Sequence, residues 1–210
     1  MTPPSRRIVA LAALLLLVAA CSSKRVLMPA PIDLHAFGTI GLLEFTSAAG
    51  PDINALASRE FLAAVHSAQP GVPVLEIGNR QRSLTDVGHA ALDADAIRAL
   101  GKRHQVDTLL VGELDARRVT PGVRLGTGFE SLSAGADLQG ALTVRMYDTR
   151  TGATLWSEAV TGSTPIATVA VANGDLSGLG VTDPLAAESH LVQALVSRAT
   201  QDFWPYWVRQ

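Results

Sequence analysis

The chain has 210 residues, with 17 Lys and Arg against 19 Asp and Glu, so its formal net charge is −2 with neutral histidines. This balance, without a block of basic residues along the chain, argues against nucleic acid or anionic lipid as a partner of the folded part. The single cysteine, Cys21, excludes an internal disulfide. The length suits one domain of ordinary size.

The first 20 residues have the pattern of a signal peptide. Two arginines precede an uncharged run, residues 8–20, which is shorter than the roughly 20 apolar residues of a membrane-spanning helix. Small residues lead from this run directly into Cys21, and this resembles the lipobox of bacterial lipoproteins, in which the cysteine is acylated and becomes the mature N-terminus. We predict a signal peptide at residues 1–20 and lipidation at Cys21. The alternative is an ordinary signal peptide followed by a chance cysteine.

The residues after Cys21 suggest where a lipidated form would reside. Ser22, rather than Asp, follows the cysteine, and this resembles the sorting pattern for the outer membrane, with the domain facing the periplasm if the source has such a membrane. Without residues 1–20, which hold two arginines and no acid, the net charge is −4. Residues 24–34 contain two prolines and little periodicity, so we expect residues 21–37 to be an extended linker and residues 38–210 a single domain.

The first half of that domain alternates between strand and helix patterns. Apolar runs at residues 39–46, 72–77 and 106–114 predict buried strands. After Gly50 and Pro51 break the first strand, Asp52 can cap a helix whose apolar stripe runs to residue 68. Asp93 and Asp95 start a second helix that ends in basic residues, as the helix dipole favours. The polar stretch between them, residues 78–92, can hold a short helix or a loop.

The second half has a different residue pattern, with more glycine and fewer helix signals. Two glycine-rich stretches, residues 119–140 and 164–181, flank a predicted hairpin of residues 141–148 and 153–162. Its connection ends in Gly152, which accepts the positive φ that closes such a turn. Asp183 and Pro184 then start a last helix, with a buried stripe at Val192, Leu195, Val196, Ala199 and Phe203. The fold class we predict is α/β, three-layer-like: a mixed sheet with helices packed on it, in the order strand-helix-strand-helix-strand, β-hairpin, C-terminal helix.

The sequence contains no strong metal-binding, nucleotide-binding or catalytic motif. No histidine has the spacing of a zinc helix, and Gly126-Thr127-Gly128 lacks the third glycine of a nucleotide loop, because Ser131 stands there. Glu44, Glu113 and Asp148 lie near predicted strand ends, where a carboxylate can be catalytic but more often caps a turn. We therefore predict no catalytic residue, no cofactor and no metal, and no enzyme.

Aromatic residues concentrate near the C-terminus. Phe203, Trp204, Tyr206 and Trp207 fall within five residues. They form either a docking patch for a partner or membrane interface, or the end of a helix that is anchored against the sheet near Trp156. We favour the anchor. Should the patch exist, its candidate residues are Trp204, Tyr206 and Trp207, with Phe129 from the first glycine-rich stretch.

Two further marks resemble a known group of bacterial envelope lipoproteins. The strand at residues 110–114 (LVGEL) and the hairpin at residues 148–156 (DTRTGATLW), after a lipobox, are similar to proteins of the CsgG/LpoB type, and the N-terminal domain of TolB shares the plan. The resemblance covers roughly residues 38–204. These are core and turn positions, so they point to a fold more than to a function.

The resemblance implies two functions. The first, which we favour, is that of LpoB: a lipid-tethered, non-enzymatic periplasmic domain that binds and regulates another envelope protein such as a peptidoglycan synthase. The second is that of CsgG: a self-oligomer that forms a curli-type secretion pore in the outer membrane. The pore requires two hairpins of roughly 20–25 residues with one apolar side, in the positions of the glycine-rich stretches. An enzyme that acts on cell-wall material is a third alternative.

Overall fold

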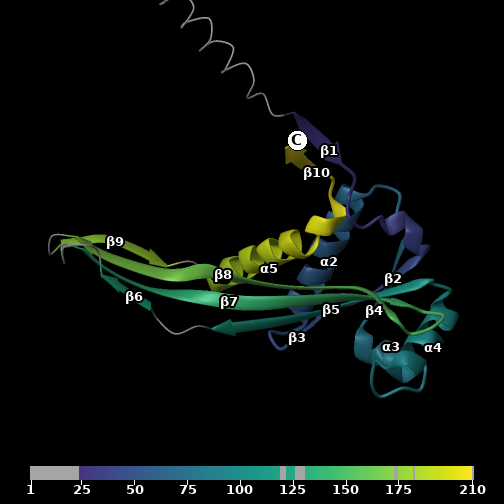
Figure 1. Ribbon diagram of the computed structural model, residues 1–210. Helices are drawn as coiled ribbons and strands as arrows, with labels where there is room; N and C mark the ends of the chain where they lie inside the picture. Colours follow the sequence, from purple (N-terminus) through teal and green to yellow (C-terminus); the bar gives the residue numbers. More distant parts are fainter. Residues whose placement is uncertain (1–23, 119–121, 126–130, 173–174, 182, 210) are drawn as a thin grey trace, which may run out of the picture.

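The structure, a computed structural model, describes residues 24–118, 122–125, 131–172, 175–181 and 183–209. Cys21 and Phe129 therefore lie outside the described residues. The described part is a mixed α/β fold built on an eight-stranded sheet, with a separate two-stranded sheet at the meeting point of the two chain ends (Figure 1). Among the described residues, no helix combines the length and apolar character needed to cross a membrane.

Parallel strands form one half of the large sheet. Strand β2 (Ile40–Leu43) lies between β4 (Val74–Gly78) and β5 (Thr108–Arg118) and is parallel to both. The short β3 (Thr46–Ser47) also pairs with β5. The predicted order of strands and helices is thus found. Parallel strands need such crossover connections, and here the connections are helices.

Each helix between the parallel strands begins after a residue that is common at helix N-caps, either glycine or a short polar side chain. Helix α2 (Pro51–Ala68) starts two residues earlier than expected, because Pro51 occupies the first turn, where its missing N–H is harmless, and Gly50 rather than Asp52 is the cap. The polar stretch after β4 contains α3 (Arg80–Asp86). Helix α4 (Ala94–His104) is capped as predicted, since the Asp93 carboxylate accepts a hydrogen bond from the Ala96 backbone N–H at 2.8 Å.

Antiparallel strands form the other half. Strand β7 (Ser131–Asp148) pairs with β5 on one side and with β8 (Thr154–Ala172) on the other. The two short strands β6 (Gly122–Leu125) and β9 (Asp175–Val181) flank their distal ends. The predicted hairpin is therefore present, but its strands extend far into both glycine-rich stretches, where the pattern of glycines had obscured them.

Helices cover both faces of the sheet, so the predicted fold class is confirmed. Helices α2 and α5 (Pro184–Ala199) pack on one face, where Leu42, Leu110 and Phe61 belong to the larger core. Helices α3 and α4 pack on the other face, where Leu43 and Leu109 belong to a second core (Figure 1). Adjacent residues of one strand enter different cores because side chains alternate along a strand. The predicted stripe of α5 is entirely buried: Val192, Leu195, Val196, Ala199 and Phe203.

The two chain ends form a small sheet apart from the large one. Strand β1 (Arg25–Met28) pairs antiparallel with β10 (Tyr206–Arg209); we call this pair the ribbon. Residues 24–37, expected as a linker, thus hold a strand and also a 3-10 helix, η1 (Leu34–Phe37), whose Leu34 is fully buried. No local pattern announces a strand whose partner lies near the opposite end of the chain, which is why the sequence alone suggested a linker.

One side chain holds the two ends of the ribbon to the body. The Gln69 amide nitrogen, at the end of α2, donates to the carbonyls of Ile32 (2.6 Å) and Phe203 (3.0 Å). Its amide oxygen accepts from the Leu34 N–H at 2.7 Å. Gln69 therefore fixes where the chain leaves the ribbon after β1 and where it returns after the second 3-10 helix, η2 (Gln201–Phe203).

Candidate functional site

The DTRTG connection between β7 and β8 is built by turn chemistry. The Asp148 carboxylate accepts hydrogen bonds from the backbone N–H groups of Arg150 (2.7 Å) and Thr151 (2.9 Å). Gly152 has φ of +78°, and its N–H donates to the Asp148 carbonyl at 2.7 Å. The Thr151 N–H, then the Arg150 N–H and the Arg150 guanidinium, hold the pKa of Asp148 below its ordinary value. This carboxylate is engaged with its own backbone.

The other two candidate carboxylates are engaged in ion pairs and hydrogen bonds. Glu113 lies 2.7 Å from the Arg80 guanidinium and 3.9 Å from that of Arg145. Glu44 accepts from the Asn79 side-chain amide at 3.1 Å. Asp148 pairs with Thr108 in the sheet register, five residues along β5 from Glu113, which is about 17 Å at strand spacing. The structure therefore does not bring the three carboxylates together as a catalytic set.

Histidines and acids also do not converge elsewhere in the described part of the chain. No group of three or more His, Cys, Asp or Glu side chains that could hold a metal ion occurs among the described residues. His89 lies 3.8 Å from Asp93 as an isolated pair. The Gly126-Thr127-Gly128 loop lies outside the described residues.

The C-terminal aromatic residues divide into an anchor and an exposed group. Phe203 is fully buried, with ring centroids 5.2 Å from Trp156 and 6.1 Å from Phe61. This is the packing against Trp156 that we favoured from the sequence. Trp204, Tyr206 and Trp207, by contrast, are exposed to 41%, 47% and 64%. These three side chains are therefore not part of the buried anchor, and their role as a partner surface stays a prediction.

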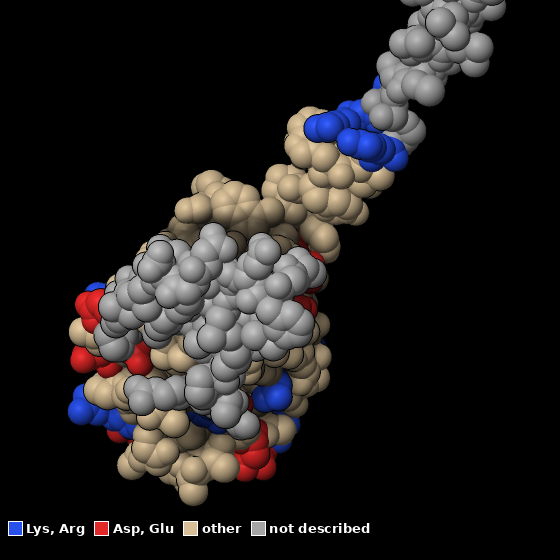
Figure 2. Space-filling view, turned by 90° about the vertical axis from the view of Figure 1, so that its left-hand side faces the viewer, with Lys and Arg blue, Asp and Glu red and all other residues tan. Residues whose placement is uncertain are grey.

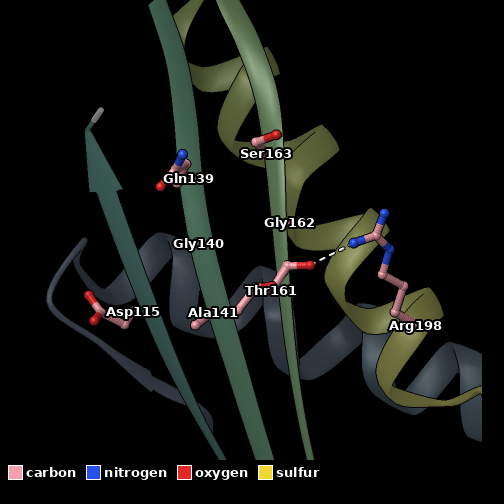
Figure 3. A pocket seen from close by; sticks show the side chains of 8 residues that line it. All are labelled: Asp115, Gln139, Gly140, Ala141, Thr161, Gly162, Ser163 and Arg198. Atoms are coloured by element: carbon pink, nitrogen blue, oxygen red, sulfur yellow. Dashed lines mark hydrogen bonds between the residues drawn. The ribbon is translucent and has the colours of Figure 1, made fainter. Parts of the chain in front are cut away.

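A groove of about 750 Å³ runs across the large sheet where it leaves the body. It is lined by three adjacent strands and by the end of α5: Asp115, Gln139, Gly140, Ala141, Thr161, Gly162, Ser163 and Arg198 (Figure 3). The two glycines lie against α5, because a Cβ on Gly140 would approach Leu191 to 3.0 Å and one on Gly162 would approach Leu195 to 3.2 Å. The residues that alternate with these glycines therefore belong to the face that α5 leaves open.

The groove presents several kinds of polar group. Arg198 donates to the Thr161 carbonyl at 2.6 Å (Figure 3), which occupies an acceptor on the edge of β8. The described lining residues offer hydroxyl, amide, carboxylate and guanidinium groups, but no histidine, lysine or cysteine. Among the described lining residues, the group that could act as a base toward a serine nucleophile is the Asp115 carboxylate. No local sequence pattern indicates this groove, since its residues come from four separate segments.

The glycine-rich stretches form a four-stranded projection in the order β6-β7-β8-β9. We call it the arm: β6, residues 131–136 of β7, residues 167–172 of β8, and β9. Helix α5 begins just after β9 and runs back over the body, so the arm extends beyond the helices (Figure 1). Its two hairpins lie side by side, as two adjacent antiparallel pairs joined by the β7–β8 ladder.

The register of the arm sorts its residues into two alternating sets. Positions paired across the strands are apolar in one set: Val123, Leu125, Leu132, Ala134, Ala136, Ala167, Val169, Val171, Leu176, Leu179 and Val181. The other set holds glycine, alanine, serine and threonine, with Arg124 and Asp175 as its two charges. The backbone register therefore places the apolar residue types at one set of paired positions and the small or polar residue types at the other.

Comparisons with known proteins find similar solved structures at low sequence identity. The sequence matches no protein-family model and no curated protein. A PelC dodecamer from Paraburkholderia phytofirmans is 14% identical, with 87% of this chain and 98% of that chain covered and a TM-score of 0.43. Lipoprotein GNA1162 from Neisseria meningitidis is 17% identical (77% and 96% covered, TM-score 0.33). The LpoB C-terminal domain from Salmonella enterica is 11% identical (60% and 82% covered, TM-score 0.35). The solved structures similar to this chain thus include bacterial lipoproteins.

Proposed function

We propose that this protein is a non-enzymatic lipoprotein of the bacterial envelope, held at the outer membrane through Cys21, that assembles with copies of itself through the arm. The lipobox supports the anchor. The carboxylates of Glu44, Glu113 and Asp148, each engaged in turn or ion-pair contacts, support a role other than catalysis.

The strand pairing of the arm is the observation that carries the assembly. Within the described residues, β6 and β9 each pair on one side only, so each presents an open edge. Such edges are templates for pairing with another chain. Edge-to-edge pairing of the arms of neighbouring copies satisfies them.

The arm fits the curli-type pore better in topology than in length. Two adjacent hairpins with one apolar set of positions are what that pore requires. The segment from Arg118 to its partner Leu138 spans 21 residues, within the expected hairpin length. The second hairpin pairs only residues 167–172 with residues 175–181, shorter than the roughly 9–11 residues of a membrane strand. We therefore place self-assembly first and membrane insertion of the arm as its further consequence.

The size of the acylated protein tests this proposal. The full chain is produced with its signal peptide, solubilised in mild detergent, and examined by mass spectrometry for the acyl group on Cys21 and by negative-stain microscopy for its assembly state. We expect rings or other uniform multimers. Dispersed particles of monomer size would overturn self-assembly, and an unmodified Cys21 would overturn the anchor independently.

A regulator of a cell-wall enzyme is the second candidate, and the groove favours it. A cleft of about 750 Å³ with hydroxyl, amide and charged groups suits an extended segment of a partner protein. This candidate predicts a monomer in detergent, and binding to a peptidoglycan synthase that weakens when Gln139 is replaced by Leu. The Lys102→Ala variant on α4, away from the groove, is the matched control.

A further inference from the structure

Exposed apolar side chains gather on the ribbon. Of the described side chains, nine large hydrophobic ones are exposed, and six of these belong to the ribbon or adjoin it: Leu27, Met28, Trp204, Tyr206, Trp207 and Val208. An isolated two-stranded sheet is marginally stable in water. The ribbon stands apart from the large sheet (Figure 1), with apolar residues on both of its faces. Such a surface indicates a contact that covers it.

One face of the ribbon combines apolar and cationic residues. Arg25 pairs with Arg209 and Leu27 pairs with Trp207, and directly paired residues share a face. Leu27 and Trp207 are more exposed (51% and 64%) than Met28 and Tyr206 of the opposite face (37% and 47%). The face that carries Met28 and Tyr206 is thus turned toward the body, and the face that carries Leu27 and Trp207 is the outer face.

The charges on the outer face favour an anionic neighbour. Arg25 and Arg209 are like charges directly opposite each other, which destabilises a strand pair. Lys24 precedes them, and neither strand contains an acid. Figure 2 shows Lys and Arg side chains gathered at the outer end of the ribbon. The basic patch is absent from the linear sequence because it forms only when residues near the two chain ends pair.

The short distance along the chain from Cys21 to the ribbon limits which surface the outer face can contact. Cys21 precedes Arg25 by four residues, a span of about 14 Å when fully extended. An acyl chain on Cys21 therefore holds the ribbon within reach of lipid headgroups. Tryptophan is favoured at the boundary between headgroups and acyl chains, and arginine is favoured at lipid phosphates.

We propose that the face formed by Arg25, Leu27, Trp207 and Arg209 lies on the leaflet that holds the Cys21 acyl group. Trp207 and Leu27 enter the headgroup boundary, and the two arginines bind anionic lipid phosphates. The inference rests on the proposed acylation but not on self-assembly. A single lipid chain binds a membrane reversibly, and a second, basic or apolar contact makes the attachment stable and oriented.

Tryptophan quenching by brominated lipid tests this contact. The acylated full chain is reconstituted into vesicles of phosphatidylcholine and phosphatidylglycerol, with and without brominated acyl chains. The chain has three tryptophans, of which Trp156 is buried in the body and Trp204 and Trp207 are exposed. We expect quenching in the wild type, retained in Trp156→Phe and reduced most in Trp207→Phe. Equal emission with and without bromine would overturn the proposal.

Two further measurements separate the alternatives. The double variant R25Q/R209Q is expected to lose quenching and its dependence on phosphatidylglycerol, whereas Lys102→Gln on α4 leaves both unchanged. Quenching that is insensitive to the arginine changes would overturn the phosphate contact. Trp207 emission that is unaffected by bromine but changes when an envelope protein is added would show that the ribbon docks on protein, which also overturns the proposal. Mass spectrometry of Cys21 identifies a failure of acylation, which removes the premise and the proposal with it, separately from a failure of the ribbon.

Discussion

At the scale of single residues, polar side chains in this protein mostly complete the backbone. Asp148 closes the β7–β8 turn, and Asp93 and Asn79 cap helices. Gln69 ties the chain ends to the body. The Asp148 turn and the Asp93 cap follow from the sequence, because Asp-x-x-Thr-Gly and Asp before an apolar stripe act on their immediate neighbours. The partners of Gln69 do not, since they lie 35 or more residues away.

Asp148→Asn tests the turn. Asparagine keeps an oxygen that accepts the two backbone hydrogen bonds but removes the charge. The pKa of Asp148 is lowered in the folded state, so its charge stabilises the fold above the unfolded pKa, and this contribution is lost as pH falls through the folded pKa. We expect the Asp148→Asn variant to have a lower Tm than wild type at pH 7, with the difference closing as the pH falls below about 4.

Calorimetry across pH, with Glu76→Gln as a charge-matched change on an exposed residue of β4, checks the direction. A Tm difference that persists unchanged into strong acid, well below the folded pKa of Asp148, would show that the substitution acts through geometry rather than through the Asp148 charge.

At the scale of elements, periodicity predicted the helices and the buried strands, and failed where strands are rich in small residues. Helix α5 follows its apolar stripe closely. The distal half of β7 is rich in serine, alanine and glycine, and that of β8 in alanine, residues whose β-propensity is low, so pairing contributes more than local preference to these strands. The ribbon strands, four residues each, are specified only by one another.

Adjacent substitutions in β8 test the two sets of positions in the arm. The register places Val169 opposite Ala134 and Leu179, in the apolar set, and Thr168 opposite Gly135 and Gly180, in the small and polar set. An arginine in an apolar set facing lipid costs about 2–4 kcal/mol at mid-bilayer. We expect Val169→Arg to reduce multimers to monomers in detergent, and Thr168→Arg to leave them intact. Equal effects of the two changes would contradict the amphipathic assignment.

At the scale of the whole molecule, the body and the ribbon are separate packing units. Both hydrophobic cores lie between the large sheet and its helices. Their membership includes Leu34 and Phe203 but no residue of β1 or β10. The Gln69 hydrogen bonds lie on the body side of the ribbon. Folding of the body therefore depends on residues up to Phe203, and the ribbon serves the contact beyond it.

Two changes at the C-terminus separate these units. A chain ended after Trp204 loses β10 but keeps Phe203, so we expect its Tm to fall by no more than the roughly 2–4 °C that 1 kcal/mol represents for a chain of this size. Phe203→Ala removes a ring packed on Trp156 and Phe61 and costs about 3–5 kcal/mol, which lowers Tm by roughly 6–20 °C. Thermal unfolding followed by circular dichroism measures both. If the truncated chain unfolded as easily as Phe203→Ala, the ribbon would belong to the folding unit, and its exposed face would owe its composition to stability rather than to the membrane.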